Sequence, residues 1–241
     1  MTVQHNKLAY VTGSSRGVGQ ALVELLLKKG FHVIGLSRTN QLEAKNFTFI
    51  ELDLSDLSKV KKFDFSMLAK QVILVNNGGV LGEVAPVGDV SNESIEKTMK
   101  VNTLAPQILM NNFVKSFREQ SGNFHILNIS SGAGKRPVPS WATYCASKAA
   151  LDLFSETLAE ELQWEEKENW HVHSCAPGVV DTKMQDEIRS VSEAKFRDVE
   201  RFKALKTNNE LLSPQTVAEK LYQIIEHPEK FKEVIISVRE L

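Results

Sequence analysis

Cysteine is scarce in this sequence of 241 residues, which also lacks long apolar runs. Its two cysteines, Cys145 and Cys175, cannot form a disulfide framework, so a reducing environment is expected. No apolar run approaches the roughly 18 residues that suggest a membrane span, and the segment from Met1 to Asn6 has no apolar signal character. We therefore expect a cytoplasmic protein with no membrane association.

An excess of charge of one sign is also missing. The chain has 29 basic and 30 acidic residues, and its formal net charge is -1. Nucleic-acid-binding modules usually carry a clear basic excess, so the composition argues against a nucleic-acid partner. Hydrophobic residues make up 42% of the chain, enough for a full core, and the length suits one domain that spans residues 1–241.

Seven short apolar runs divide the chain, and we expect each to form a strand. They are Leu8–Val11, Phe31–Leu36, Phe47–Leu52, Val72–Val75, Phe124–Ile129, Trp170–Ala176 and Val234–Val238. Continuous apolar runs are typical of strands that are buried on both faces of a parallel sheet. Helical patterns lie between them. The sequence therefore predicts an α/β fold: one Rossmann-like, doubly wound parallel sheet of about seven strands with helices on both faces.

A glycine-rich segment, Thr12–Gly19, follows the first predicted strand and leads into a helix. Its spacing is G-x-x-x-G-x-G rather than the common G-x-G-x-x-G. Glycine lets the backbone turn tightly and lets a phosphate approach the helix N-terminus. The alternative is an ordinary strand–helix turn, but the position at the first strand favours a dinucleotide site. The residues expected to bind the cofactor here are Gly13, Ser15, Arg16, Gly17, Val18 and Gly19.

The end of the second predicted strand indicates which nicotinamide cofactor is used. An acidic residue is expected there if the ribose diol of NAD is bound, but the sequence has Ser37 and Arg38. Arg38 and Arg16 can instead hold a 2′-phosphate through their guanidinium groups. Two solvated surface arginines are the alternative. We therefore predict NADPH (NADP+ after oxidation) rather than NADH.

Tyr144 and Lys148 lie four residues apart at the start of a long predicted helix, so they share one face. Ser131 follows the strand Phe124–Ile129, at the edge where parallel sheets bind ligands. Ketone reduction needs a proton at oxygen, and a lysine charge ~5 Å away at an effective dielectric constant of ~20 lowers a tyrosine pKa by about 2 units. A serine hydroxyl can hold the carbonyl oxygen. An incidental tyrosine and lysine on an amphipathic helix is the alternative.

Together these motifs resemble the short-chain dehydrogenase/reductase family over nearly the whole chain. The resemblance rests on Thr12–Gly19, Asp53-Leu54, Asn76–Gly79, Asn102, Ser131, Tyr144-x-x-x-Lys148, Pro177-Gly178 and Asp181-Thr182. It implies that Tyr144 is the catalytic acid/base, that Ser131 positions the substrate, and that Asn102 supports a proton relay. It also implies that Lys148 binds the nicotinamide ribose.

The same resemblance implies the other cofactor contacts. Asp53 would face the adenine, and Thr182 would meet the nicotinamide amide. The remaining implied cofactor residues are Leu54, Asn77, Gly78, Pro177, Gly178, Val180 and Tyr144. Gly78 stands where the family usually has alanine, and we expect the missing methyl group to loosen packing slightly.

Four longer segments are similar to the sepiapterin reductase and benzil reductase branch of the family, whose members reduce a ketone in a dicarbonyl or α-hydroxyketone. These segments are Asn76–Glu83, Leu127–Ser131, Trp141–Lys148 and Ala176–Gln185. We expect Trp141, Leu81 and Met184 to line the substrate pocket, and the polar segment 181–206 to form a lid over it. Glu240 is the nearest counterpart of the carboxylate that anchors a pterin, and a solvated terminal carboxylate is the alternative.

Two other functions are compatible with the same fold: an NAD-linked alcohol dehydrogenase, and an NADPH-sensing regulator without turnover. Ser37-Arg38 argues against the first, and the complete Ser131, Tyr144 and Lys148 set argues against the second. No metal is expected, because His171 and His173 lack nearby partners that would complete a ligand set. The family resemblance implies a homodimer or homotetramer, packed through the helices around Asn102–Arg118 and Tyr144–Glu161.

Overall fold

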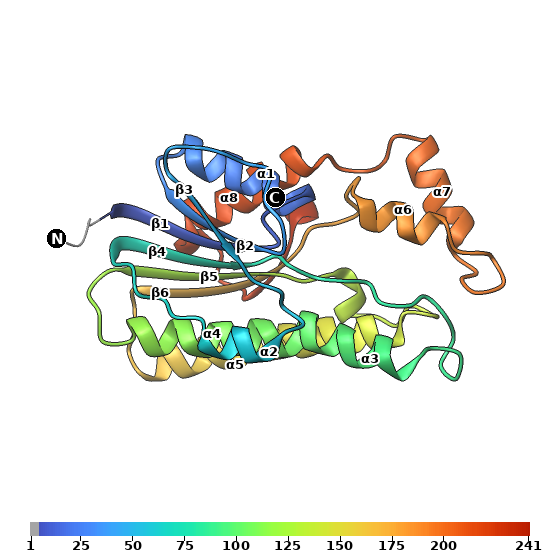
Figure 1. Cartoon of the computed structure of the whole chain (residues 1–241), viewed down its shortest axis with the longest axis horizontal. Helices are drawn as coiled ribbons and strands as arrows, with labels where there is room; N and C mark the ends of the chain where they lie inside the picture. The colour runs from blue at the N-terminus through green and yellow to red at the C-terminus, as the bar shows by residue number, and fades with distance from the viewer. Residues whose placement is uncertain (1–4) are drawn as a thin grey trace.

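The computed structural model describes residues 5–241, which form a seven-stranded parallel sheet with helices on both faces (Figure 1). The strands are β1 His5–Thr12, β2 His32–Ser37, β3 Phe47–Glu51, β4 Ala69–Asn76, β5 Asn123–Ile129, β6 Trp170–Ala176 and β7 Ile235–Ser237. All seven predicted strands are confirmed, with ends that differ by a few residues. Side chains from both faces of β1, β2, β4 and β5 are buried, which explains their continuous apolar runs.

The sheet has the order β3-β2-β1-β4-β5-β6-β7. The chain therefore begins in the middle of the sheet, winds outward to β3, and then returns to place β4 beside β1. Val11 of β1 is level with Gly35 on one side and with Val75 on the other. The order reverses between β1 and β4, and this is the place where doubly wound sheets bind ligands beyond the carboxyl ends of their strands.

Two helical layers cover the sheet (Figure 1). The helices are α1 Gly17–Lys28, α2 Leu57–Lys62, α3 Asn92–Met99, α4 Ala105–Phe117, α5 Ala142–Trp164, α6 Lys183–Arg189, α7 Val199–Thr207 and α8 Pro214–Glu226. Helices α1 and α8 pack on one face, whereas α2, α4 and α5 cover the other. Each layer has its own buried cluster: Leu22 and Leu221 lie in the first, and Phe113 and Leu151 in the second.

The polar segment 181–206 contains α6 and most of α7. These two helices project beyond the main layers of the fold (Figure 1). The Nζ atom of Lys206 lies 2.5 Å from the Asp181 carboxylate, so an ion pair joins the two ends of the segment. Within residues 5–241 no helix is both long and apolar enough to cross a membrane.

Three histidines gather on β5 and β6. His125 Nε2 lies 2.9 Å from His173 Nδ1, and His173 Nε2 lies 3.0 Å from the carbonyl oxygen of Phe231. Because a carbonyl only accepts, His173 carries its proton on Nε2 and accepts a hydrogen bond from His125 at Nδ1. His171 completes the group, with its ring 6.1 Å from that of His125. Neither these histidines nor any other three His, Cys, Asp or Glu side chains in the described part of the chain are arranged so that they could hold a metal ion together.

This histidine group is expected to make the fold sensitive to acid. Burial lowers the pKa of His125, His171 and His173 below the ordinary value, so unfolded histidines bind protons more readily than folded ones. The free energy of unfolding should therefore fall as the pH decreases below about 6.5, the ordinary histidine pKa. Urea unfolding of wild type and His125→Gln between pH 7.5 and 5 measures this. An equally steep pH dependence in the variant would contradict the assignment to His125.

Candidate active site

Two loops meet beyond the carboxyl ends of β1 and β4. The Thr12 hydroxyl oxygen accepts hydrogen bonds from the backbone nitrogens of Asn77 at 3.0 Å and Gly78 at 2.9 Å. The side-chain amide of Asn77 donates in return to the carbonyl oxygens of Thr12 and Gly13. Gly13 has a φ of 65°, and a Cβ atom there would lie 2.8 Å from the Cα of Gly78. The glycine at position 13 is therefore required both by its conformation and by the neighbouring loop.

The N-terminus of α1 suits a phosphate group. Arg16 precedes the helix without capping it through its side chain, and the first turn contains no acidic residue. The first backbone N–H groups of a helix have no partners within it, and the helix dipole favours an anion there. A Cβ at Gly19 would lie 2.2 Å from the Gly13 carbonyl oxygen, so the helix starts close against the turn. The residues present therefore fit the pyrophosphate of a dinucleotide.

The residues predicted to select the cofactor lie at the end of β2, where Ser37 and Arg38 follow one another, and at the start of α1, which Arg16 precedes. Ser37 is buried, and its hydroxyl donates to the carbonyl oxygen of Thr39 at 2.7 Å. Arg16 and Arg38 are exposed, and neither lies within 4.0 Å of a carboxylate oxygen in residues 5–241. The two guanidinium groups are thus available for an anion.

Asp53 lies in the same region. Partial burial raises its pKa, but hydrogen bonds from Ser55 and the charges of Arg38 and Lys97 outweigh that effect and lower it overall. Ser55 donates to one carboxylate oxygen from both its backbone nitrogen, at 2.8 Å, and its hydroxyl, at 2.7 Å. Asp53 is therefore held as a carboxylate near two cations.

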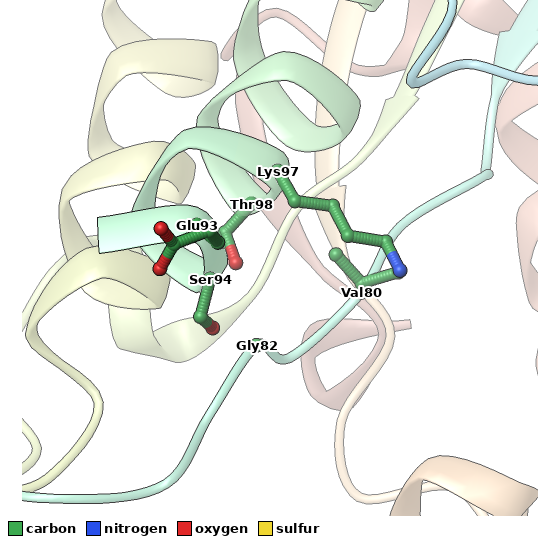
Figure 2. Close-up of a pocket in the computed structure, with 6 residues that line it drawn as sticks. All are labelled: Val80, Gly82, Glu93, Ser94, Lys97 and Thr98. Atoms are coloured by element: carbon green, nitrogen blue, oxygen red, sulfur yellow. The ribbon is translucent and has the colours of Figure 1, made fainter. Parts of the chain in front are cut away.

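A cavity of about 330 Å³ lies between the β4–α3 loop and α3. Figure 2 shows the Lys97 side chain reaching across this space to Val80. The other lining residues are Gly82, Glu93, Ser94 and Thr98. None of the six was predicted as a site residue. The cavity borders the site through Val80, whose backbone nitrogen and oxygen both hydrogen-bond to the Asn102 side chain.

The structure brings Ser131, Tyr144 and Lys148 together. The Ser131 hydroxyl is close enough to interact with Tyr144, and the Lys148 Nζ atom lies 5.8 Å from the centre of the Tyr144 ring. Lys148 donates a hydrogen bond to the carbonyl oxygen of Ile129 at 2.8 Å, which aims its long side chain at the end of β5. The serine precedes the short helix η2 Gly132–Gly134, and its hydroxyl accepts a hydrogen bond from the Ala133 nitrogen.

The electrostatics of Tyr144 differ from the expectation. The sequence argument lowered its pKa through Lys148, but burial raises the pKa, and this effect exceeds the lowering by Ser131. Burial also lowers the pKa of Lys148 to about 8, although the Asp152 charge opposes it. The predicted direction of the Tyr144 shift was wrong because the Coulomb argument left out the desolvation of both groups. The phenol of Tyr144 is therefore protonated at neutral pH.

Asn102 has a structural role that the sequence did not indicate. It lies in a π-helical turn, η1 Lys100–Leu104, and is 1% exposed. Besides holding Val80, its amide donates to the Ser147 hydroxyl at 3.1 Å. A Cβ at Gly79 would lie 3.3 Å from Asn102 Oδ1 and 3.7 Å from Lys148 Nζ, so both side chains flank this glycine. Such π-helical turns occur frequently at functional sites.

An apolar cluster buries Tyr144. Trp141 packs edge-on against the Tyr144 ring at 5.8 Å and stacks on Phe196 of the 181–206 segment at 5.3 Å. Leu81 and Met184, the other predicted pocket residues, belong to the same cluster. The indole nitrogen of Trp141 is buried and has no hydrogen-bond partner in the described chain. The structure thus brings the three predicted pocket residues together around Tyr144.

The loop after β6 returns to the glycine turn. Gly178 adopts a φ of 76°, and Val180 pairs with Leu212 in a short parallel bridge. A Cβ at Gly17 would lie 3.3 Å from Thr182 Cγ2, so Thr182 and the glycine turn are in contact. Glu240 is exposed in the short helix η4 Val238–Glu240 after β7.

A family model for short chain dehydrogenases matches residues 7–193. This chain belongs to the short chain dehydrogenase family. A benzil reductase ((S)-benzoin forming) of Bacillus subtilis is 35% identical over 228 residues, with 91% of this chain and 93% of the relative covered. A short chain dehydrogenase/reductase from Saccharomyces cerevisiae is similar in structure, with a TM-score of 0.82, 27% identity, and coverage of 97% and 96%.

The family gives the class of reaction. A 4-hydroxyisoleucine dehydrogenase complexed with NADH superposes with a TM-score of 0.78 and 26% identity, covering 96% of each chain. As a short chain dehydrogenase, the chain is an oxidoreductase that uses a nicotinamide cofactor. The glycine turn described above is the part of the structure that fits such a cofactor.

Several residues that organise this short chain dehydrogenase were not predicted as site residues. Thr12 joins the two loops, although it was noted only as part of the glycine motif. Asn128 links three elements: it accepts from Asn76 at 2.8 Å and donates to Ser155 at 2.8 Å. The available signal is an uncharged polar residue at the end of an apolar run, where burial requires a hydrogen-bond partner.

The packing at Gly78 corrects one expectation. A methyl group missing from the family's usual alanine was expected to loosen the structure. Instead, a Cβ at Gly78 would lie only 2.5 Å from Leu54 Cδ1, because the Leu54 side chain already fills this space. The Leu54 side chain therefore fills the space that is left by the glycine at position 78.

Gly78→Ala is accordingly expected to destabilise this dehydrogenase by less than about 1 kcal/mol, because the colliding Leu54 Cδ1 is the end of a flexible, half-buried side chain that can turn aside. A second change, Leu54→Ala, removes the colliding methyl group. It should therefore reduce the loss of unfolding free energy that Gly78→Ala causes. Gly132→Ala is the matched control, since a Cβ there meets nothing within 4 Å. Urea unfolding of the variants provides the measurement. Additive effects of the Gly78 and Leu54 changes would contradict the contact.

Proposed function

We propose that the chain is an NADPH-dependent carbonyl reductase that reduces one ketone of a dicarbonyl or an α-hydroxyketone. The observation that carries the proposal is the grouping of Ser131 beside the protonated Tyr144, with Trp141, whose buried N–H has no partner in the described chain, packed edge-on against the Tyr144 ring. Ser131 and Tyr144 can donate hydrogen bonds to the oxygen of a reacting carbonyl, and the Trp141 N–H can donate one to a second substrate oxygen. The similarity to a benzil reductase, an enzyme named for a diketone, supports the same substrate class.

Each catalytic residue has a distinct role in this proposal. Ser131 holds the carbonyl oxygen while negative charge develops on it. Tyr144 then donates its phenolic proton to that oxygen, and its raised pKa keeps the proton available at neutral pH. Lys148 places a positive charge beneath the phenol, where it stabilises the phenolate that remains after proton transfer. When bound, the reduced nicotinamide supplies the hydride for the carbonyl carbon.

The cofactor would extend along the carboxyl edge of the sheet. The start of α1 would bind the pyrophosphate, and Arg16 and Arg38 would bind a 2′-phosphate. Asp53 would face the adenine at one end, while Thr182 would meet the nicotinamide amide at the other. Further contacts are proposed for residues of the loops after β3, β4 and β6, namely Leu54, Asn77, Gly78, Pro177, Gly178 and Val180.

The segment 181–206 would act as the lid of the site. Its Phe196 stacks on Trp141 and is fully buried, so closure excludes water from the reacting groups. Gln185, at the start of the segment, has a buried side-chain oxygen without a partner in the described chain and can accept a hydrogen bond from a substrate hydroxyl. Glu240 remains a proposed anchor for a pterin-like substrate.

A substrate panel tests this function. With NADPH present, we expect kcat/KM for benzil to exceed that for acetophenone by at least about 10-fold, because only benzil offers a second oxygen to Trp141. Sepiapterin and a simple vicinal diketone test the width of the pocket. NADPH oxidation at 340 nm measures each rate. Tight NADPH binding without turnover of any ketone would contradict the proposal and favour a regulator.

A further inference from the structure

Asp152 is a buried carboxylate to which the catalytic roles proposed above assign no part. It lies on α5, four residues after Lys148 and eight after Tyr144, so the three side chains follow one another along one side of the helix. Asp152 is 8% exposed. Burial of a carboxylate is costly unless the group is paired or hydrogen-bonded, so this position needs a physical reason.

Two contacts hold the carboxylate in place. Asp152 Oδ1 accepts a hydrogen bond from the Ser174 hydroxyl of β6 at 2.6 Å. Asp152 Oδ2 lies against Gly134, where a Cβ atom would come within 2.7 Å of this oxygen and within 3.1 Å of the Lys148 carbonyl carbon. Gly134 in turn donates its backbone N–H to the Ser131 carbonyl oxygen at 2.9 Å. The carboxylate therefore lies beneath the turn that carries Ser131 and beside the backbone of Lys148.

The surroundings of Lys148 contain little other charge. Lys148 is 5% exposed, and the hydrogen-bond acceptor of its ammonium is the neutral carbonyl of Ile129 on β5. Asn102 and Gly79, which approach from η1 and from the loop after β4, are neutral as well. On α5 itself, Tyr144 is a protonated phenol. The negative charge of Asp152, on the same helix, opposes the effect of burial on the Lys148 pKa.

We propose that Asp152 is a positioning residue, whose carboxylate, held by the Ser174 hydroxyl and lying beside Gly134, keeps Lys148 as an ammonium beneath Tyr144. At neutral pH Lys148 then keeps the positive charge and the N–H donors that the proposed reaction needs. Without Asp152, the buried lysine would lose its proton at a lower pH. The catalytic consequence rests on the function proposed above, but the charge state of Lys148 does not.

The direct test measures the pKa of Lys148. Protein labelled with 15N-lysine is titrated by NMR, and Lys148→Met assigns the Lys148 signal. Asp152→Asn is expected to lower the Lys148 pKa by about one unit, the size expected for a charge within roughly 10 Å. Ser174→Ala removes the hydrogen bond but keeps the charge, so it should reduce stability and change this pKa much less. An unchanged Lys148 pKa in Asp152→Asn would overturn the proposal.

The rate profile provides a second readout. Because the Lys148 charge disappears as the pH rises through its pKa, activity should fall on the alkaline side, and in Asp152→Asn this fall should begin about one pH unit lower. Asp152→Glu, which keeps the charge, should restore part of the range. A lowered Lys148 pKa with an unchanged rate profile would support the role of Asp152 and contradict the role proposed for Lys148.

If Asp152→Asn does not fold, the interaction can be tested by changing Lys148 instead. In Lys148→Met the carboxylate of Asp152 is buried without a cation, so protonation should relieve its cost. Relative to wild type, this variant should therefore regain stability as the pH is lowered from 7 to 5. Parallel stability curves for Lys148→Met and wild type over this range would contradict an interaction between the two residues.

Discussion

Tyr144→Phe should bind NADPH with nearly unchanged affinity and reduce the preferred ketone about a thousandfold more slowly, the usual size of general acid catalysis. The variant loses only the phenolic hydroxyl group, and with it the proton that is donated. Tyr144 lies inside an apolar cluster, with its ring edge-on to Trp141, so phenylalanine fits the same space. Ser131 still donates a hydrogen bond to the carbonyl oxygen, but the alkoxide that forms has no adjacent acid to protonate it. The loss should therefore appear in kcat rather than in KM.

Tyr222→Phe is the matched control for this experiment. The Tyr222 hydroxyl lies 3.1 Å from a carboxylate oxygen of Glu226 on α8, in the helical layer that packs with α1. Its removal should leave kcat within about twofold of wild type, because this hydrogen bond stabilises α8 and involves none of the residues proposed for the reaction. NADPH fluorescence titration separates binding from turnover. A Tyr144→Phe enzyme that retained more than a tenth of the wild-type kcat would exclude Tyr144 as the proton donor.

The strands were predictable because their environment is uniform. Val72–Val75 is apolar throughout, since β4 is covered by a helical layer on each face. The ends were less accurate for a physical reason. β1 and β4 continue to His5 and Ala69, which pair with each other through the backbone. Such pairing depends on the neighbouring strand and not on the hydrophobicity of the residue itself.

The assembly of the site was predictable where it depends on local geometry. Tyr144 and Lys148 share a helix face by spacing, and Ser131 is placed by the end of β5. Contacts over long sequence distances were not predictable: Asn102 holds the backbone of Val80, 22 residues away. The predicted direction of the Tyr144 pKa shift was wrong for the same reason. Phe196, Ile188 and other residues far along the chain contribute to the cluster that buries it.

The packing at Gly78 could not be predicted from the family resemblance, because it depends on the neighbouring side chain. A glycine in place of alanine suggests a small void when one position is considered alone. In this chain Leu54 occupies that volume, because its side chain reaches the loop after β4. Protein interiors are close-packed, so the volume at one residue has meaning only together with its neighbours.

Arg38→Leu should weaken NADPH binding about 10- to 100-fold, the range expected when charge-assisted hydrogen bonds to a phosphate are lost. Arg38 is exposed and lies near Asp53, whose pKa it lowers, so it belongs to the edge where a 2′-phosphate would bind. NADH lacks this phosphate, and its binding should change by less than about threefold. The preference for NADPH over NADH, measured as a ratio of kcat/KM values, should fall by the same 10- to 100-fold.

Arg118→Leu is the matched arginine control. Arg118 caps the C-terminal end of α4 and pairs with Glu165 at 3.0 Å, far along the chain from the residues of the predicted cofactor site. Its loss should leave the cofactor ratio unchanged, whereas a general effect of net charge would weaken NADPH binding in both variants. Adding Arg16→Leu to Arg38→Leu should reduce the ratio further, because both guanidinium groups would contact one phosphate. Equal losses for NADPH and NADH in Arg38→Leu, or a wild-type enzyme that prefers NADH, would contradict the assignment of the 2′-phosphate to this arginine pair.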